Sequence, residues 1–568
     1  MRRPLLRLLA LLFAFGMVAA ACGSDSAGDG GPDGATEDTT EDTTDDTTDE
    51  GAESSGGGGE FIDLGTFVGD PPEHLDPALN STLDAYQVIN AVYDGLTEID
   101  TSDPDNPQIV PLVADSVEAN ADASVWTFHI REGAQFSDGE EINASTFQAS
   151  WERAADLAGD YSYLITFIDG GSERLDGTAD TISGVDADDA SRTLTVTLAA
   201  PYSNFDAVAG FQLFMPVPEA ATAAGAEWEN GVMVGNGPYA MEAARTDEEI
   251  VLVRNDEWQG DYDGETWPDR LESIVFRTMS DPDTGYNAFE AGEGDNTNIP
   301  PGRIADAIEN WATTTDVSIL GSYHFVINGR DPRIGGDANL KLRQAISTAI
   351  NREEINEAVY NGSRTPATGI TPAGIPGYSA GICEFCAYDP ELAQSLVDEW
   401  KAAGGAQTEP LPIQFNADAG HEPVIQIILD NLTAVGIEAV AQPFPSETYF
   451  SELAKGACTL CRAGWFADYP TYDNFMFDLF HSSALDGNNF GFVNDDFDAL
   501  VDEAKQTTDK AAQAELFQQA EGVLLNQQTM AVPIVWYRGD YAYDPERVTN
   551  FPQTNFGLII WEQVTVAE

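Results

Sequence analysis

The order of predicted elements between residues 388 and 441 limits the fold most narrowly. Asp389 can cap a helix that starts at the following proline. A strand is predicted at 412–415, then a helix with apolar residues at helical spacing over 424–435, and a second strand at 437–441. A strand, a helix and a strand in succession indicate a partly parallel sheet with helices packed on it. This order predicts the α/β class for the part of the chain that folds.

The composition allows a large core and argues against one class of partner. The chain has 568 residues, of which 42% are hydrophobic, and roughly one domain per 150 residues predicts three or four domain-sized parts. It has 97 Asp and Glu residues against 25 Lys and Arg residues, which gives a formal charge of -72. Because binding to nucleic acid depends on clustered basic residues, this charge argues against nucleic acid as a partner.

The beginning of the chain has the features of an export signal. Arg2, Arg3 and Arg7 precede an apolar stretch over 8–21, which is too short to favour a helix that spans a membrane. Small residues come directly before Cys22, as in a bacterial lipobox, where the signal is removed and the cysteine carries a lipid. We therefore expect a lipoprotein signal peptide and lipidation at Cys22, with an ordinary signal peptide as the alternative.

Residues 22–60 differ in composition from everything that follows. They consist almost entirely of small, polar and acidic residues and contain no apolar periodicity. Such a segment cannot bury enough apolar surface to form a core, and its like charges favour an extended chain. We expect an acidic, disordered tether between the lipid and the folded body.

Four further cysteines form two Cys-x-x-Cys pairs, Cys383 with Cys386 and Cys458 with Cys461. Two such pairs can hold a tetrahedral zinc ion, and a redox role is also known for this spacing. The export signal, however, indicates an oxidising compartment, in which disulfides persist. We therefore expect two disulfides, whose connectivity the sequence leaves open.

The sequence contains no established catalytic or metal-binding motif. It lacks the Gly-x-Ser-x-Gly, His-Glu-x-x-His and phosphate-loop patterns, and no two of its five histidines have the spacing of metal ligands on a helix. Pairs of acidic residues, which glycosidases use, arise by chance in a chain with 97 acids. We expect no catalytic residue, no metal and no cofactor, although an exported hydrolase and an adhesin or scaffold remain alternatives.

Seven groups of short motifs, in the expected order over about 500 residues, give the chain a family resemblance. The chain resembles the extracytoplasmic solute-binding proteins of peptide ABC transporters, the oligopeptide- and dipeptide-binding family 5. The segments that carry the resemblance are 75–77 with 93–96, 126–133 with 136–139, 235–239, 341–352, 371–378, 464–470 and 489–492.

The resemblance implies an α/β fold with two lobes, of the periplasmic-binding-protein type II, with an extra subdomain in the first lobe. Chain segments would cross between the lobes at a hinge, and closure around a ligand would be a hinge motion. The implied division is a signal peptide at 1–21, the tether at 22–60, lobe I at 61–102, 234–327 and 541–568, the extra subdomain at 103–233 and lobe II at 328–540.

The resemblance also implies a function. The chain is expected to be a monomeric, lipid-anchored component of an ABC importer on the outer face of the cytoplasmic membrane. It would capture peptides between its lobes and deliver them to a permease with separate ATPase subunits, and it would not be an enzyme. The alternative is the same fold with a non-peptide solute, such as a nickel chelate or a sugar.

Within this family an aspartate pairs with the α-ammonium group of the ligand, and Asp468 occupies the matching position. A carboxylate in a closed, poorly solvated cleft can form a strong charge-assisted hydrogen bond with such a group. The presence of Asp468 therefore favours peptides over other solutes. Asn489, in the last matching segment, is a further candidate for the cleft.

Several aromatic residues are candidates for the walls of the cleft. Trp465, Phe466 and Tyr469 flank the aspartate in the sequence. Trp465 and Phe466 can equally be buried residues of a strand. Tyr86 and Tyr323 are candidates to face the cleft from the first lobe.

Overall fold

The computed structural model describes residues 58–69, 71–101, 107–260, 270–417, 420–445, 448–449, 452–483 and 490–567. Cys22 and Asn489, on which predictions were made, lie outside these ranges. Gly56–Glu568 forms one compact unit. Its two large sheets mix parallel and antiparallel strands and pack with helices, which confirms the α/β class.

Lobe I is built on a seven-stranded sheet whose central strand, β1, pairs in parallel with β10 and β11. Phe61 on β1 packs against Phe551 and Trp561 from the end of the chain, so the C-terminal segment completes the core of this lobe. In spatial order the strands are β12 (Ala312–Thr313), β19 (Tyr541–Tyr543), β11 (Asn296–Asn298), β1 (Glu60–Asp63), β10 (Ser273–Arg277), β9 (Glu249–Arg254) and β8 (Tyr239–Met241). The helices of lobe I are α1 (Leu83–Val92), α6 (Pro282–Glu290) and α7 (Ile304–Asn310).

The extra subdomain contains an antiparallel four-stranded sheet with its own buried core. Along β5, Trp126, Phe128 and Ile130 are buried and alternate with half-buried residues, as expected when one face of a strand packs on a core. The strands are β4 (Ala114–Ala119), β5 (Val125–Ile130), β7 (Thr193–Thr197) and β6 (Val185–Asp188). The helices are α2 (Ala144–Leu157), η1 (Asp160–Phe167), α3 (Gly171–Leu175), α4 (Phe205–Ala209), η2 (Gln212–Phe214), α5 (Glu219–Ala224) and η3 (Gly225–Asn230).

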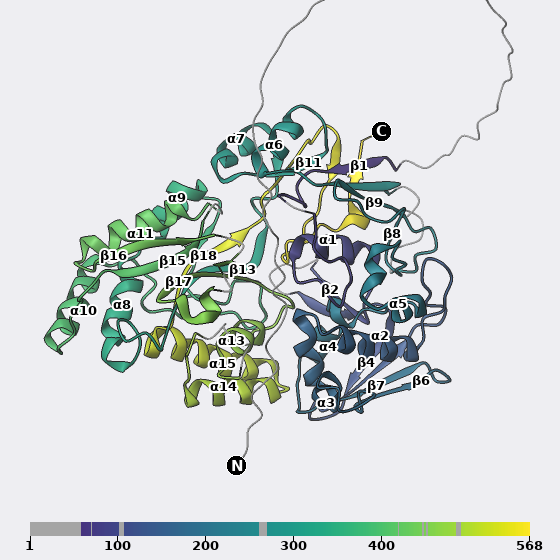
Figure 1. Ribbon diagram of the computed structural model, residues 1–568, viewed down its shortest axis with the longest axis horizontal. Helices are drawn as coiled ribbons and strands as arrows, with labels where there is room; N and C mark the ends of the chain where they lie inside the picture. The colour runs from purple at the N-terminus through teal and green to yellow at the C-terminus, as the bar shows by residue number, and fades with distance from the viewer. Residues whose placement is uncertain are drawn as a thin grey trace, which may run out of the picture. The chain divides into compact units, whose positions relative to one another are not determined.

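Lobe II is built on a six-stranded sheet, and Figure 1 shows α8 to α11 grouped around it. In spatial order its strands are β14 (Thr365–Pro366), β18 (Ala531–Arg538), β13 (Ser318–Ile327), β17 (Leu460–Phe466), β15 (Leu411–Asn416) and β16 (Ala439–Phe444). Its helices are α8 (Leu340–Ala349), α9 (Arg352–Tyr360), α10 (Pro390–Ala402), α11 (Glu422–Ala434), α13 (Asp473–Phe480), α14 (Asp495–Gln506), α15 (Lys510–Gly522) and the wider turns η7 (Leu453–Ala457) and η8 (Val523–Gln528).

The strand, helix and strand predicted in lobe II are confirmed. β15 and β16 run in parallel and are joined by α11. The predicted cap of the preceding helix is confirmed too, because the side chain of Asp389 accepts a hydrogen bond from the backbone N–H of Leu392 (2.9 Å).

The chain passes between the two large sheets at 314–317 and again at 539–540. The two crossings are bonded to each other: the N–H of Thr314 donates to the carbonyl of Tyr541, and the N–H of Gly539 donates to the carbonyl of Val317 (both 3.0 Å). These short, paired crossings are suited to act as a hinge. The division expected at residue 327 needs correction, because β13 pairs with β17 and β18 and so belongs to lobe II.

Both Cys-x-x-Cys pairs form local disulfides in the structure. The bonds join Cys383 to Cys386 and Cys458 to Cys461, with Cα–Cα distances of 5.4 and 5.6 Å. All four cysteines are buried within the core of lobe II. Each bond joins two cysteines that are three positions apart in the same segment, and neither bond joins the two segments.

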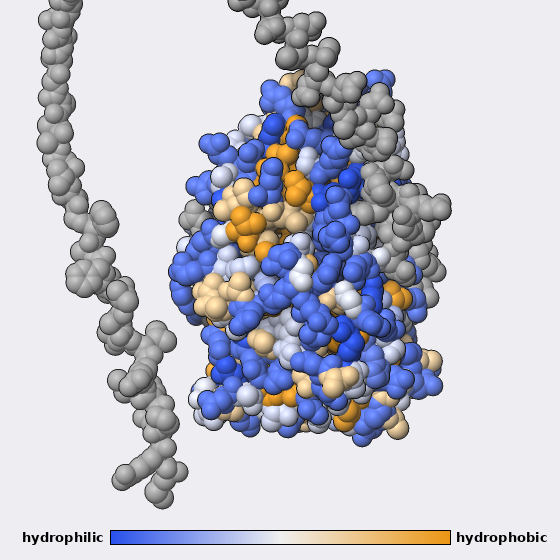
Figure 2. Space-filling view, turned by 90° about the vertical axis from the view of Figure 1, so that its right-hand side faces the viewer, coloured by the Kyte–Doolittle hydropathy of each residue, from blue (hydrophilic) through white to orange (hydrophobic). Residues whose placement is uncertain are grey.

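The remaining elements are short. They are the hairpin of β2 (Thr97–Asp100) and β3 (Gln108–Pro111), the pair β20 (Val548–Asn550) and β21 (Thr565–Val566), and the turns η5 (Pro301–Arg303), η6 (Asp337–Asn339) and η9 (Trp561–Gln563). Among the described residues, no helix is both long and apolar enough to cross a membrane. Hydrophilic residues cover most of the face shown in Figure 2, and apolar residues occur there in small groups.

Candidate functional site

Asp468 lies at the end of β17, in the short segment that leads into α13. β17 is held in place by β13, with which it pairs from Leu460 to Phe466. The following turn is fixed by Asn474 in the first turn of α13, whose side-chain oxygen accepts a hydrogen bond from the backbone N–H of Asp468 (3.1 Å). The position of the carboxylate is therefore set by a central strand and by the start of a helix.

The carboxylate of Asp468 accepts hydrogen bonds from both sides of the interlobe boundary. Tyr161 of the subdomain donates its hydroxyl to Oδ1 (2.8 Å), and Asn474 of lobe II donates its amide to Oδ2 (3.0 Å). Burial raises the pKa of the Asp468 carboxyl to about 6, although both hydrogen bonds act to lower it. No ion pair with a described Lys, Arg or His side chain offsets the cost of burying this charge.

One edge of β17 is open beside Asp468. β17 pairs with β15 only at Leu460 and Cys461, and the carbonyl of Arg462 accepts a hydrogen bond from the hydroxyl of Tyr449 (2.7 Å). From Ala463 to Phe466 this edge has no strand partner among the residues that the structure describes. An extended peptide can add to such an edge through its backbone, whatever its side chains are.

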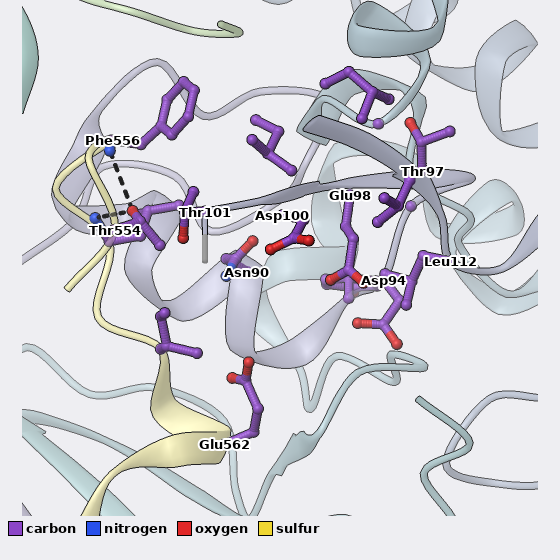
Figure 3. A pocket seen from close by; sticks show the side chains of 18 of the residues that line it. Asn90, Asp94, Thr97, Glu98, Asp100, Thr101, Leu112, Thr554, Phe556 and Glu562 are labelled. Atoms are coloured by element: carbon purple, nitrogen blue, oxygen red, sulfur yellow. Dashed lines mark hydrogen bonds between the residues drawn. The ribbon is translucent and has the colours of Figure 1, made fainter. Parts of the chain in front are cut away.

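A cavity with a volume of about 1220 Å³ lies beside Asp468, which is part of its wall. Most of the remaining wall comes from lobe I and the subdomain: from α1, from the β2–β3 hairpin and from the segment 551–563. Figure 3 shows side chains of these segments around the cavity. The volume exceeds the roughly 300–1,000 Å³ of typical small-molecule sites, so there is room for a ligand of several residues.

The cavity wall is strongly acidic. Its described carboxylates are Asp94, Glu98, Asp100, Asp115, Asp468 and Glu562, and Figure 3 shows four of them, Asp94, Glu98, Asp100 and Glu562. Burial raises the pKa of Asp94 to about 8 and that of Glu562 to about 7, and the charge of Glu98 adds to both effects. Arg131 is the single basic residue in the described wall, and its guanidinium donates to the backbone carbonyls of Leu112 and Gln259. The wall is therefore suited to a ligand that carries positive charge.

The aromatic residues proposed as cleft walls lie in different places. Tyr86 lines the cavity. Phe466 is 42% exposed and stacks on Tyr537 of β18, with ring centroids 4.7 Å apart, so its ring lies over β13, on the paired side of β17. Trp465 is half-buried and donates its indole N–H to Asn474 (2.9 Å).

Tyr469 and Tyr323 are both buried outside the described lining of the cavity. The hydroxyl of Tyr469 donates to Asp478 (2.8 Å), and its ring packs with the core of the subdomain. Tyr323 lies on β13 and so belongs to lobe II rather than to the first lobe. Tyr469 thus bridges the two parts of the molecule as a core residue.

Several residues of the site were not predicted from the sequence. Tyr161 is separated from Asp468 by 307 residues, and no motif links the two positions. The carboxylates of Asp94 and Glu562 meet only because the end of the chain returns to lobe I. In a chain with 97 acidic residues, only the fold distinguishes these from acids on the surface.

Comparisons with known proteins agree on one family. The sequence model described as "Bacterial extracellular solute-binding proteins, family 5 Middle" matches residues 108–487. The chain is 24% identical to the oligopeptide-binding protein OppA of Bacillus subtilis, over 94% of this chain and 95% of OppA. It is 29% identical to the probable deoxycholate-binding periplasmic protein YgiS of Escherichia coli, over 82% of this chain and 86% of YgiS.

A solved structure shows the same fold. The murein tripeptide binding protein MppA of Escherichia coli superposes with a TM-score of 0.72 at 23% identity, over 90% of this chain and 99% of MppA. This likeness confirms the two-lobed periplasmic-binding fold, and the family match covers most of the chain. The chain belongs to family 5 of the bacterial extracellular solute-binding proteins.

Proposed function

We propose that this chain is the solute-binding component of an ABC importer, and that it captures peptides between its lobes and delivers them to a membrane permease. Membership of family 5 supports the class of function. The observation that carries the choice of peptide is the position of Asp468, a half-buried carboxylate without a described cationic partner at the end of an open strand edge. The α-ammonium group and the backbone of a peptide match these two features together.

The proposed binding mode uses both features at once. The α-ammonium group pairs with Asp468, where low solvation strengthens a charge-assisted hydrogen bond. The peptide backbone then adds to the open edge of β17, and the exposed ring of Phe466 at the end of this strand contacts the ligand. Trp465 supports this wall through its bond to Asn474, and we retain Asn489 as a candidate contact.

The experiment compares peptides with free and with acetylated α-amines. The protein is purified under native conditions, and any ligand it carries is released and identified by mass spectrometry. A tripeptide library is then titrated into the ligand-free protein by calorimetry, with each peptide also tested in its N-acetylated form. We expect the free-amine peptides to bind and acetylation to weaken binding at least tenfold. Equal binding of both forms would exclude Asp468 as the α-ammonium site.

A non-peptide solute is the second candidate, and one relative specifically favours it. The match to YgiS, named as a probable deoxycholate-binding protein, shows that a protein similar to this chain is assigned a sterol-derived ligand. Deoxycholate is an anion, however, and the cavity wall here carries six described carboxylates and one arginine. Titration of deoxycholate beside the peptides decides between the two, because binding of deoxycholate alone would replace the peptide proposal.

We also propose that the protein is anchored through a lipid on Cys22 and acts as a monomer on the outer face of the cytoplasmic membrane. The apolar stretch and the small residues before Cys22 support this proposal. The expected outcome is a lipid-modified mature N-terminus in the intact mass and recovery in the membrane fraction. Cys22→Ser should abolish both, and a wild-type N-terminus without lipid would exclude the anchor.

A further inference from the structure

Asn474 is the most completely bonded polar residue near the proposed ligand anchor. Its side chain is fully buried. Its oxygen accepts hydrogen bonds from the indole N–H of Trp465 (2.9 Å) and from the backbone N–H of Asp468 (3.1 Å). Its amide group donates to Oδ2 of Asp468 (3.0 Å) and to Oδ2 of Asp478 (2.9 Å). All four hydrogen-bonding positions of the amide are thus occupied.

These partners allow one orientation of the Asn474 amide. A flipped side chain would direct its NH₂ group at two N–H donors and its oxygen at two carboxylates, so every contact would become repulsive. Because the residue is buried, water cannot replace the lost bonds. The amide is therefore a fixed donor directed at Asp468.

The bonds to Asp468 control the carboxylate in two ways. Asn474 is hydrogen-bonded to both the backbone N–H and Oδ2 of Asp468. The same amide group therefore fixes the main chain and the carboxylate of Asp468 relative to each other. A donor directed at a carboxylate also favours its charged form over its neutral form. Asp478, the other acceptor, is bonded to Tyr469 and lies outside the described cavity wall.

We propose that Asn474 is a positioning residue, which orients the Asp468 carboxylate for the ammonium group of the ligand. This inference rests on the proposed function. It differs from a purely structural role in α13, because a structural role requires only that the helix start be stable. A positioning role requires that the ionisation of Asp468 and the affinity for an ammonium group change together.

The test measures the pH dependence of binding in variants of Asn474. The tripeptide Ala-Lys-Ala, with a free amine, is titrated into wild-type protein, Asn474→Leu and Asn474→Ser from about pH 5 to about pH 8. Tyr472→Phe is the matched control, because it removes the buried hydrogen bond from Tyr472 to Glu521 at the same end of α13, and this hydroxyl is directed at Glu521 rather than at Asp468.

We expect both variants of Asn474 to bind Ala-Lys-Ala about tenfold or more weakly at pH 7 than the wild type does. The pH below which affinity declines should also move upward, because the charged carboxylate has lost a donor. Tyr472→Phe should lose thermal stability and keep the wild-type pH profile.

The outcomes separate the two hypotheses. If Asn474→Leu does not fold, as judged by circular dichroism, Asn474→Ser decides, since its smaller side chain fits the same space. Unchanged affinity and pH profile in a folded variant would overturn the positioning role, as would a loss no greater than that of Tyr472→Phe. Wild-type protein that binds neither Ala-Lys-Ala nor any free-amine tripeptide of the library would instead contradict the proposed function.

Discussion

Asp468 and Asp473 lie five residues apart in lobe II, and each accepts a hydrogen bond from a tyrosine of the subdomain, yet their surroundings differ. Asp473 is 2% exposed and accepts bonds from the hydroxyl of Tyr202 and from the amide of Asn204 (2.9 Å). Asp468 is half-buried, is bonded to Tyr161 and lines the cavity, whereas Asp473 does not line it.

Positive charge is distributed unequally between the two aspartates. Lys505 and Lys510, two of the five lysines in the chain, lie on the side of Asp473. Lys510 donates to the side chain of Asn204 (2.6 Å), and the ammonium of Lys505 lies 5.0 Å from the ring centroid of Tyr202. The negative charge of Asp473 is thus accompanied by positive charge from the protein's own lysines. Asp468 lacks an equivalent ammonium group among the described residues, and a ligand can supply one.

The largest expected effect is the loss of binding on substitution of the anchor. Asp468→Asn removes the charge and keeps the shape, so the affinity for free-amine peptides should fall by about 2–5 kcal/mol. The free energy of unfolding should fall by less than this, because no ion pair is lost and the new amide keeps one acceptor for the two donors, Tyr161 and Asn474. Calorimetry and chemical denaturation measure the two quantities. N-acetylated peptides serve as the control, and an equal loss of their affinity would show that Asp468 does not contact the α-amine.

Substitution of Asp473 should give the opposite pattern. Asp473→Ala leaves the hydroxyl of Tyr202 and the amide of Asn204 buried without their acceptor, at a cost of about 1–3 kcal/mol for each group. The midpoint of thermal unfolding should fall, and peptide affinity should fall less than in Asp468→Asn. Asp473→Asn, which retains one acceptor, should be milder. If Asp473→Ala lost peptide binding at full stability, the division between the two aspartates would be wrong.

More of the fold than of the site could be predicted from the sequence, because the patterns that indicate helices and strands lie within short stretches of the chain. The segment that forms β15, α11 and β16 has its period, cap and turn residues within about fifty neighbouring positions, and the structure has the predicted order. The expected lobe boundary at residue 327 is wrong because nothing in the local sequence of β13 indicates which of the two sheets it joins. Its ten residues are almost all buried and would fit a central strand in either lobe.

Within the site, the sequence could indicate Asp468 through its motif but not the groups around it. Tyr161 and the carboxylates of the cavity wall come together from segments hundreds of residues apart. Aromatic residues that are close in sequence also differ in burial, since Tyr469 is in the core and Phe466 is exposed. From the sequence alone, both have the same expected place in the cleft wall. Tyr469 packs into the core of the subdomain and Phe466 stacks on Tyr537 of β18, and both contacts join segments that are far apart in the sequence.

The ionisation of Asp468 should make binding depend on pH. Its pKa is raised to about 6, mainly by burial, and the bound ammonium group requires the charged carboxylate. Affinity should therefore fall as pH drops below about 6, by up to about tenfold per pH unit, while the α-ammonium of the peptide stays charged there. Titrations at a series of pH values measure this profile. In Asp468→Asn the decline near this pH should disappear, and its persistence would assign it to another group.

The smallest expected effect concerns the side chains of the peptide. The acidic wall should favour Ala-Lys-Ala over Ala-Glu-Ala by about two- to fivefold at low salt, within the range of exposed ion pairs, and added salt should reduce the preference. Because the pKa values of Glu562 and Asp94 are raised to about 7 and about 8, both groups become more fully charged as pH rises from 7 to 9. The ratio of the two affinities should rise over that interval, while deprotonation of the α-amine weakens both peptides alike and cancels in the ratio. Glu562→Gln should flatten the rise, and a preference that does not depend on salt or pH would mean that the charged wall of lobe I does not contact the ligand side chain.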